Sequence, residues 1–141
     1  MKLLHTGIVV RDRGTSIAFY RDVVGLTLLR ELARRGPDID QVVGYEQTHL
    51  RSALLDLGGG NALELIQYVN PPPSERPTEE RNVLGAGHFA IQVADIRAVY
   101  DRLAAGGAKV MNPPVRLGPD RQACYLQDPD GNWIELVEMN D

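Results

Sequence analysis

The segments HTGIVVRD (residues 5–12) and HFAIQVAD (residues 88–95) carry His, Ile, Val and Asp at the same offsets. A second pair of similar segments follows in the same order, GNALEL at residues 60–65 and GNWIEL at residues 131–136. Self-similarity with a preserved order is typical of a repeated structural unit. The sequence therefore predicts two halves built on one plan, each of which opens near a His and closes near a Glu.

Each half begins with a short strand of alternating β-branched residues, near residues 8–10 and 89–93, and the segment ends at an Asp. A helix is expected next, and in the first half Thr15 or Ser16 is a candidate N-cap while Gly25 suits the C-terminal cap. Both helices have an apolar face at helical spacing. Its residues are Ile17, Phe19, Tyr20, Val23 and Val24 in the first half and Ile96, Val99, Tyr100 and Leu103 in the second.

Three short strands are expected after each helix, from runs enriched in β-branched and other apolar residues. They fall near residues 26–32, 50–57 and 62–69, and again near residues 108–111, 122–127 and 133–138. The predicted fold class is therefore α+β, with two tandem βαβββ modules. The first half is longer than the second, and residues 34–49 are interpreted as a loop insertion.

A proline-rich, charged stretch, NPPPSERPTEERN at residues 70–82, separates the halves. Proline lacks the backbone donor that helices and central strands need, so this stretch is predicted to be an extended surface linker. We accordingly place the first module at residues 1–70, the linker at 71–84 and the second module at 85–141.

Bulk composition excludes several classes of protein. With 141 residues, of which 43% are hydrophobic, the chain can bury one substantial core. A net charge of −4 argues against non-specific nucleic-acid binding. No apolar run is long enough to cross a membrane, and the first residues lack a signal-peptide cleavage pattern, so a cytoplasmic location is expected. The single cysteine, Cys124, has no second thiol for an internal disulfide.

Four residues form a candidate metal site: His5, Glu64, His88 and Glu135. Because side chains alternate along a strand, the opening His and closing Glu of each half reach the same sheet face if their strands are neighbours. Both Glu residues interrupt apolar segments, where an unpaired carboxylate is costly. Two imidazoles and two carboxylates suit Ni, Co, Mn, Fe or Zn, so the sequence predicts one divalent cation.

The opening segment MKLLHTGIVVRDRGTSIAFYRDVVGLTLLRE (residues 1–31) and the closing segment DPDGNWIELVE (residues 128–138) resemble the vicinal oxygen chelate superfamily. This group includes the glyoxalases, bleomycin-resistance proteins and extradiol dioxygenases, and the resemblance covers nearly the whole chain. Within it, the sequence looks most like lactoylglutathione lyase (glyoxalase I) and next like methylmalonyl-CoA epimerase. The resemblance implies a cupped mixed sheet around the metal, and commonly a homodimer.

The resemblance also implies a ligand set, because the four metal-binding positions of the lyase pattern fall on His5, Glu64, His88 and Glu135. That pattern further expects an Arg four residues after the first His and an Asn four residues after the first Glu, both of which hold glutathione. Val9 and Tyr68 stand at those positions here. The two glutathione anchors are therefore absent.

The expected activity is proton transfer on the carbon next to a metal-bound carbonyl group, through an enediolate, on a small-molecule carbonyl substrate. The resemblance implies that Glu135 acts as the base. The near symmetry of the halves makes Glu64 its partner on the opposite face of the substrate. Together these roles predict a metal-dependent lyase or isomerase.

Two other functions are compatible with the same resemblance. An extradiol-type dioxygenase uses two His and one Glu, which match His5, His88 and Glu135, but no His follows His88 to serve as its acid/base residue. A non-catalytic protein that binds a drug or metabolite is the second alternative. The epimerase pattern needs a Glu where Arg51 stands.

Overall fold

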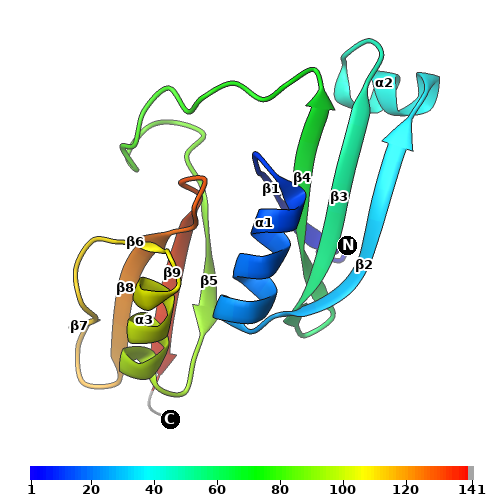
Figure 1. Cartoon of the computed structure of the whole chain (residues 1–141). Helices are drawn as coiled ribbons and strands as arrows, with labels where there is room; N and C mark the ends of the chain where they lie inside the picture. Colours follow the sequence, from blue (N-terminus) through cyan, green and yellow to red (C-terminus); the bar gives the residue numbers. More distant parts are fainter. Residues whose placement is uncertain (140–141) are drawn as a thin grey trace. The chain divides into compact units, whose positions relative to one another are not determined.

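A computed structural model of the chain describes residues 1–139. It divides into two compact units, residues 1–76 and residues 77–141, and each unit has its own sheet (Figure 1). The boundary falls inside the proline-rich stretch, and residues 71–84 contain no helix or strand. The predicted α+β class is confirmed. Residues 140–141, the end of the expected second module, lie outside the described residues.

The first unit has a four-stranded sheet in the order β1-β4-β3-β2, in which β1 and β4 are parallel and the other neighbours are antiparallel. Its elements are β1 (His5–Val9), α1 (Arg13–Ala18), the π-helical segment η1 (Phe19–Val24), β2 (Thr27–Arg35), α2 (Pro37–Val43), β3 (His49–Gly58) and β4 (Asn61–Asn70).

The second unit repeats this topology with the strand order β5-β9-β8-β6, and β5 and β9 are again parallel. A short additional strand, β7, pairs with β8 and was not expected from the sequence. The elements are β5 (His88–Gln92), α3 (Ile96–Ala105), β6 (Lys109–Val110), β7 (Val115–Arg116), β8 (Arg121–Gln127) and β9 (Trp133–Met139).

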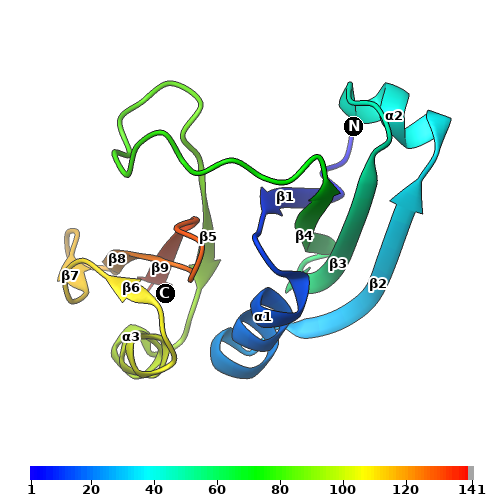
Figure 2. The ribbon, with the colours of Figure 1, turned by 45° about the horizontal axis from the view of Figure 1, so that its top comes forward.

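In each unit, a helical segment packs on one face of the sheet and covers the apolar core (Figure 2). The expected apolar faces are largely buried: Tyr20 is 0% exposed and Ile96 is 1% exposed. Beneath them, the strand residues that alternate with the candidate Glu ligands are fully buried. Those residues are Leu63 and Leu65 in β4 and Ile134 and Leu136 in β9. One face of β4 and of β9 therefore packs into the core, and the opposite face carries the candidate Glu ligands.

The N-cap of the first helix differs from the prediction. Asp12, rather than Thr15 or Ser16, caps α1: its Oδ1 accepts hydrogen bonds from the backbone N–H and the hydroxyl of Thr15, both at 2.8 Å. Asp95 caps α3 in the same way, accepting from the N–H of Ala98 at 2.9 Å. The Asp that the two repeats share is therefore a capping residue. Gly25, with φ of 96°, ends the first helical segment as expected.

A second feature of the repeat joins each helix to the strand that carries the candidate Glu. Gln67 Oε1 accepts a hydrogen bond from the backbone N–H of Arg13, and Glu138 Oε2 accepts one from the N–H of Ile96. Both acceptors lie three residues after the candidate ligand. They satisfy orphan donors of the first helical turn, and so hold the helix start against the end of the strand.

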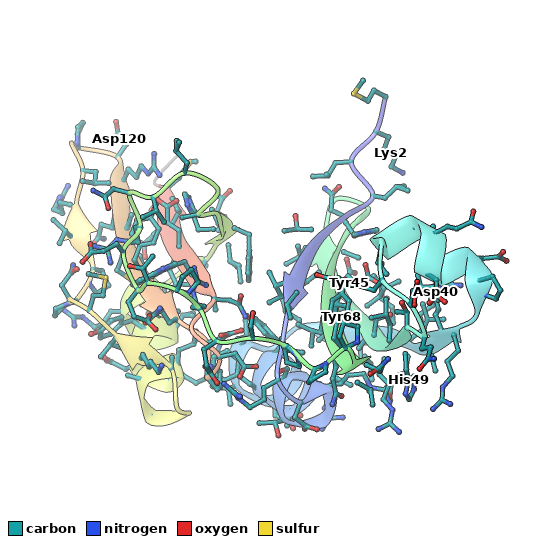
Figure 3. All side chains as sticks on the ribbon, turned by 90° about the horizontal axis from the view of Figure 1, so that it is seen from above. Lys2, Asp40, Tyr45, His49, Tyr68 and Asp120 are labelled. Atoms are coloured by element: carbon teal, nitrogen blue, oxygen red, sulfur yellow. The ribbon has the colours of Figure 1, made fainter. Side chains whose placement is uncertain are left out.

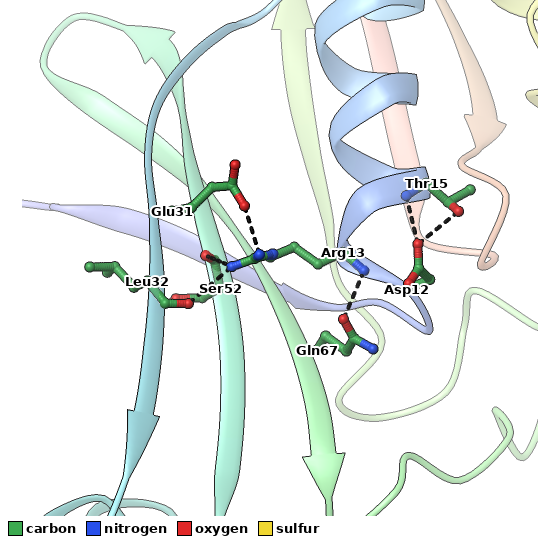
Figure 4. A network of polar contacts seen from close by, with 7 residues as sticks. All are labelled: Asp12, Arg13, Thr15, Glu31, Leu32, Ser52 and Gln67. Atoms are coloured by element: carbon green, nitrogen blue, oxygen red, sulfur yellow. Dashed lines mark hydrogen bonds and ion pairs between the residues drawn. The ribbon is translucent and has the colours of Figure 1, made fainter.

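Arg13 extends this connection across the sheet (Figure 4). Its guanidinium donates to the backbone carbonyls of Leu32 in β2 and Ser52 in β3, at 3.1 and 3.3 Å, and forms an ion pair with Glu31 at 2.7 Å. The first turn of α1 is thereby bonded to three strands, because Gln67 belongs to β4.

Removing the cap of α1 tests this account. Asp12→Ala is expected to lower the free energy of unfolding by about 1 kcal/mol, whereas Asp12→Asn keeps an acceptor and stays close to the parent. Hydrogen bonds from Thr15 lower the pKa of Asp12, so its contribution is present at neutral pH and is lost as the pH falls below about 4. Urea denaturation at pH 7 and pH 3 measures both effects, and an equal loss for Ala and Asn would contradict the capping role.

The expected loop insertion at residues 34–49 is partly wrong, because the segment contains the end of β2 and the helix α2. Helix signals were present: Pro37 occupies the first turn and Gly44, with φ of 76°, ends the helix. The carboxylate of Asp40 accepts hydrogen bonds from the backbone N–H groups of Gln47 and Thr48. These bonds fold the end of the segment back onto α2, close to the labelled Tyr45 and His49 (Figure 3).

No helix among residues 1–139 is long and apolar enough to span a membrane.

Candidate functional site

Strand register places His5 and Glu64 on one face of the first sheet. In the parallel pair β1–β4, His5 lies opposite Ala62, two residues before Glu64, so the three side chains project to the same side. His5 Nε2 lies 3.2 Å from Glu64 Oε2. The Glu64 side chain is 21% exposed and that of His5 is 47% exposed. The pair is therefore accessible from solvent.

The second unit repeats this geometry. His88 lies opposite Trp133, two residues before Glu135, and its Nε2 is 3.2 Å from Glu135 Oε2. The side chain of Glu135 is 12% exposed and that of His88 is 44% exposed. Of the four residues predicted from the sequence, the structure thus brings together His5 with Glu64 in one unit and His88 with Glu135 in the other.

The spacing of each pair suits two ligands of one metal ion. Nitrogen and oxygen donors about 2.0–2.2 Å from an ion, at angles between octahedral and tetrahedral, lie about 3.0–3.5 Å apart. Both observed separations, 3.2 Å, fall in that range. Among residues 1–139, no group of three or more His, Cys, Asp or Glu side chains gathers as a metal site. Each unit therefore contains one His–Glu pair with this spacing.

The two His–Glu pairs differ in the residues that surround them. Arg121 Nη2 donates to Glu135 Oε1 at 3.0 Å, and the hydroxyl of Tyr125 lies 3.2 Å from His88 Nε2 and 3.5 Å from Glu135 Oε2. In the first unit, the residue across the strand from Glu64 is Leu54, where the second unit has Tyr125 opposite Glu135. The second pair is therefore held in a polar network, while the strand beside Glu64 presents an aliphatic side chain.

The phenol of Tyr125 acts as a hydrogen-bond donor in this network. Burial raises the pKa of Tyr125, and the negative charge of Glu135 raises it further, so the hydroxyl keeps its proton at neutral pH. Arg121 and Tyr125 were not among the site residues predicted from the sequence. Tyr125 stands opposite Glu135, and Arg121 lies four residues earlier on the same face of β8, opposite Met139. Their even spacing along one strand was the available signal.

The two positions at which the resemblance expects glutathione anchors lie on the same sheet face as Glu64, by strand alternation. Val9 is 47% exposed at the end of β1. Tyr68 on β4 stacks edge-on against Tyr45, with ring centroids 6.1 Å apart. This face of the first unit therefore presents an aliphatic and an aromatic group where the resemblance expects an Arg and an Asn.

Cys124 is 3% exposed, and burial raises the pKa of its thiol to about 11. We expect no reaction with a thiol reagent in the native protein at pH 8, and one reactive thiol per chain after denaturation. An unfolded thiol ionises near pH 8.5, so this group favours unfolding increasingly as the pH rises from there through 11. Rapid native labelling would contradict the buried, protonated thiol.

Comparison with known proteins agrees with this architecture. Residues 2–136 match the family model of the glyoxalase/bleomycin resistance protein/dioxygenase superfamily. The chain is 31% identical to the uncharacterized protein YwbC of Bacillus subtilis over 136 residues, which cover 95% of this chain and 94% of that protein. It is also 31% identical to a probable lactoylglutathione lyase of Vibrio cholerae, covering 97% of this chain and 90% of that one.

Among solved structures, a glyoxalase family protein from Bacillus cereus superposes with a TM-score of 0.88 at 26% identity. The match covers 100% of this chain and 97% of that chain.

Proposed function

Because the chain belongs to the glyoxalase/bleomycin resistance protein/dioxygenase superfamily, we propose that it is a divalent-metal-dependent lyase or isomerase. The proposed reaction moves a proton on the carbon next to a carbonyl group of a small substrate. The observation that carries the proposal is the pair of equivalent His–Glu contacts, each 3.2 Å long, on parallel strands. An isolated contact of this kind is commonly structural, but its recurrence in both units at the same register favours ligation.

The proposed cation is held by His5, Glu64, His88 and Glu135 together. Two imidazoles and two carboxylates neutralise a divalent charge and suit Ni, Co, Mn, Zn or Fe. A bound ion would supply Lewis acidity toward the substrate carbonyl. A homodimer, which the family resemblance implies, belongs to the same proposal, and sedimentation analysis tests it. The cytoplasmic location expected from the sequence is proposed with it.

The two carboxylates have different proposed roles. Glu135 accepts the proton from the substrate carbon, and Arg121 on its Oε1 keeps the carboxylate oriented while it does so. Glu64, whose cross-strand neighbour is Leu54, serves as the base on the opposite face. An isomerase that inverts a carbon centre uses both residues, whereas a lyase uses one to remove the proton and to return it to the adjacent carbon.

Relatives named lactoylglutathione lyase make thiohemiacetals the first substrate class to test. The proposal does not require glutathione as the thiol, because Val9 and Tyr68 occupy the positions of its two expected anchors. Acyl-CoA thioesters and sugar-like ketones have the same acidic carbon and form the second group.

The test is substrate proton exchange in D₂O, followed by proton NMR, on chelator-treated protein before and after one equivalent of each metal. Metal-dependent incorporation of deuterium next to the carbonyl is the expected result. Oxygen uptake with catechols and iron would instead support the dioxygenase alternative. Saturable ligand binding with neither exchange nor metal dependence would leave the non-catalytic binding protein as the function.

A further inference from the structure

The second unit contains a pocket of about 220 Å³ next to the His88–Glu135 pair. The side chains on its wall offer hydrogen-bond donors and aromatic surface, and include no carboxylate. The wall is formed by Arg81, Ala86, Gly87, His88, Tyr125 and Trp133. Such a wall is complementary to a ligand that brings hydrogen-bond acceptors.

One of these donors has no acceptor. Trp133 is 5% exposed, and its indole Nε1 is buried without a hydrogen-bond partner among the described residues. The indole nitrogen can only donate, so an acceptor is needed to satisfy it. Buried donors in native proteins are nearly always paired, and an orphan calls for a specific explanation. Because this nitrogen has less than 1 Å² of accessible surface, it is not the group that meets a ligand in the pocket, and the indole ring forms part of the wall there instead.

The second donor is a cation without a neutralising partner. The Cζ atom of Arg81 lies 4.6 Å from the centroid of the Trp133 ring, and Nη1 contacts the sulfur of Met111 at 2.8 Å. No carboxylate of residues 1–139 lies within ion-pair distance of this guanidinium. Thioether sulfur is a weak acceptor, and a guanidinium has five N–H donors, so most of its capacity is available.

We infer that this pocket binds the carboxylate of a small organic acid, with the Arg81 guanidinium as its donor. Charge-assisted hydrogen bonds from Arg to a carboxylate are among the strongest in proteins. The rings of Trp133, Tyr125 and His88 follow one another, with centroids 6.4 and 5.1 Å apart. An acid anchored at Arg81 therefore has its remaining atoms toward His88.

This inference narrows the substrate class, and in that respect it rests on the proposed function. The carbonyl compound would carry a carboxylate group, which Arg81 fixes while the reacting carbon lies near Glu135. Binding of the acid can be measured separately from the proposed reaction, because it uses side chains of the second unit alone and requires no metal ion.

Intrinsic fluorescence measures this binding directly, because Trp133 is the single tryptophan of the chain. The probes are lactate and its uncharged analogue lactamide, titrated into chelator-treated protein at constant ionic strength. We expect a saturable change with lactate and none with lactamide. An equal response to both probes, or no saturable response to lactate, overturns the inference without the need for a variant.

Arg81→Gln is expected to weaken lactate binding by roughly 10-fold to 100-fold, since it removes charge-assisted hydrogen bonds. The matched control is Arg97→Gln, which removes an exposed Arg of α3 outside the pocket wall and should bind lactate like the parent. Parental affinity in Arg81→Gln would overturn the inference.

The same titration separates this inference from the proposed function. Lactate binding that depends on Arg81, in a protein that takes up none of the candidate metals, supports the pocket and removes the metal-dependent activity. A fluorescence response that appears only after metal is added, and that Arg81→Gln does not weaken, places the carboxylate at the metal. That result overturns the pocket assignment and leaves the proposed function in place.

Discussion

Replacing either Glu64 or Glu135 with Ala is expected to lower the affinity for a divalent cation by about 100-fold or more. Loss of a residue that only supports a ligand costs about 10-fold to 100-fold in metal affinity, and loss of a ligand should cost at least as much. In the proposed site the remaining three residues lack one of the two charges that neutralise the ion. Metal analysis after gel filtration, together with calorimetric titration, measures the change.

Glu46→Ala is the matched control, because Glu46 is exposed in the segment between α2 and β3. It should retain the metal content of the parent, about one ion per chain. If both Glu64→Ala and Glu135→Ala hold metal as tightly as Glu46→Ala, the four-residue site is wrong. If only one weakens binding, the two His–Glu pairs do not hold one ion together.

The largest expected loss of stability follows from removing a core residue directly behind the candidate ligands. Leu65 and Leu136 each follow a candidate Glu on the same strand, and both are 0% exposed. Replacing either with Ala removes buried apolar surface and leaves a cavity, so the free energy of unfolding should fall by about 2–5 kcal/mol. Thermal and urea denaturation measure the loss.

Leu84→Ala provides the comparison, because Leu84 is 104% exposed and should change stability by less than about 0.5 kcal/mol. A loss in Leu84→Ala as large as in Leu136→Ala would contradict the assignment of the two strand faces. The Glu side chains project from the opposite face of the same strands. The Leu variants should therefore bind metal like the parent at low temperature, where they are folded, and should lose it only when they unfold.

Several elements were predictable because their signals are local. Residues close together in the sequence determine the alternating strands, the apolar helix faces and the glycine that ends η1. The recurrence of His and Glu at matching positions identified the two halves. The helix α2 was equally readable from Pro37 and Gly44, yet it was interpreted as part of a loop. The N-cap was missed for another reason. Thr15 and Asp12 are both favoured capping residues, and only the structure shows that the helix begins at Arg13, which makes Asp12 the cap.

Local periodicity was sufficient for the α+β class and the strand–helix plan, because each depends on residues close together in the chain. The choice of His5, Glu64, His88 and Glu135 as candidates came from the recurrence of two short segments in the same order, which is also visible in the sequence. The unequal surroundings of the two His–Glu pairs depend on strand register. Arg121 and Tyr125 meet Glu135 across a hairpin, and Arg81 lies on Trp133 from a segment without regular structure. Composition and spacing do not specify such long-range contacts, since a shift of one residue in register turns every side chain to the opposite face of the sheet.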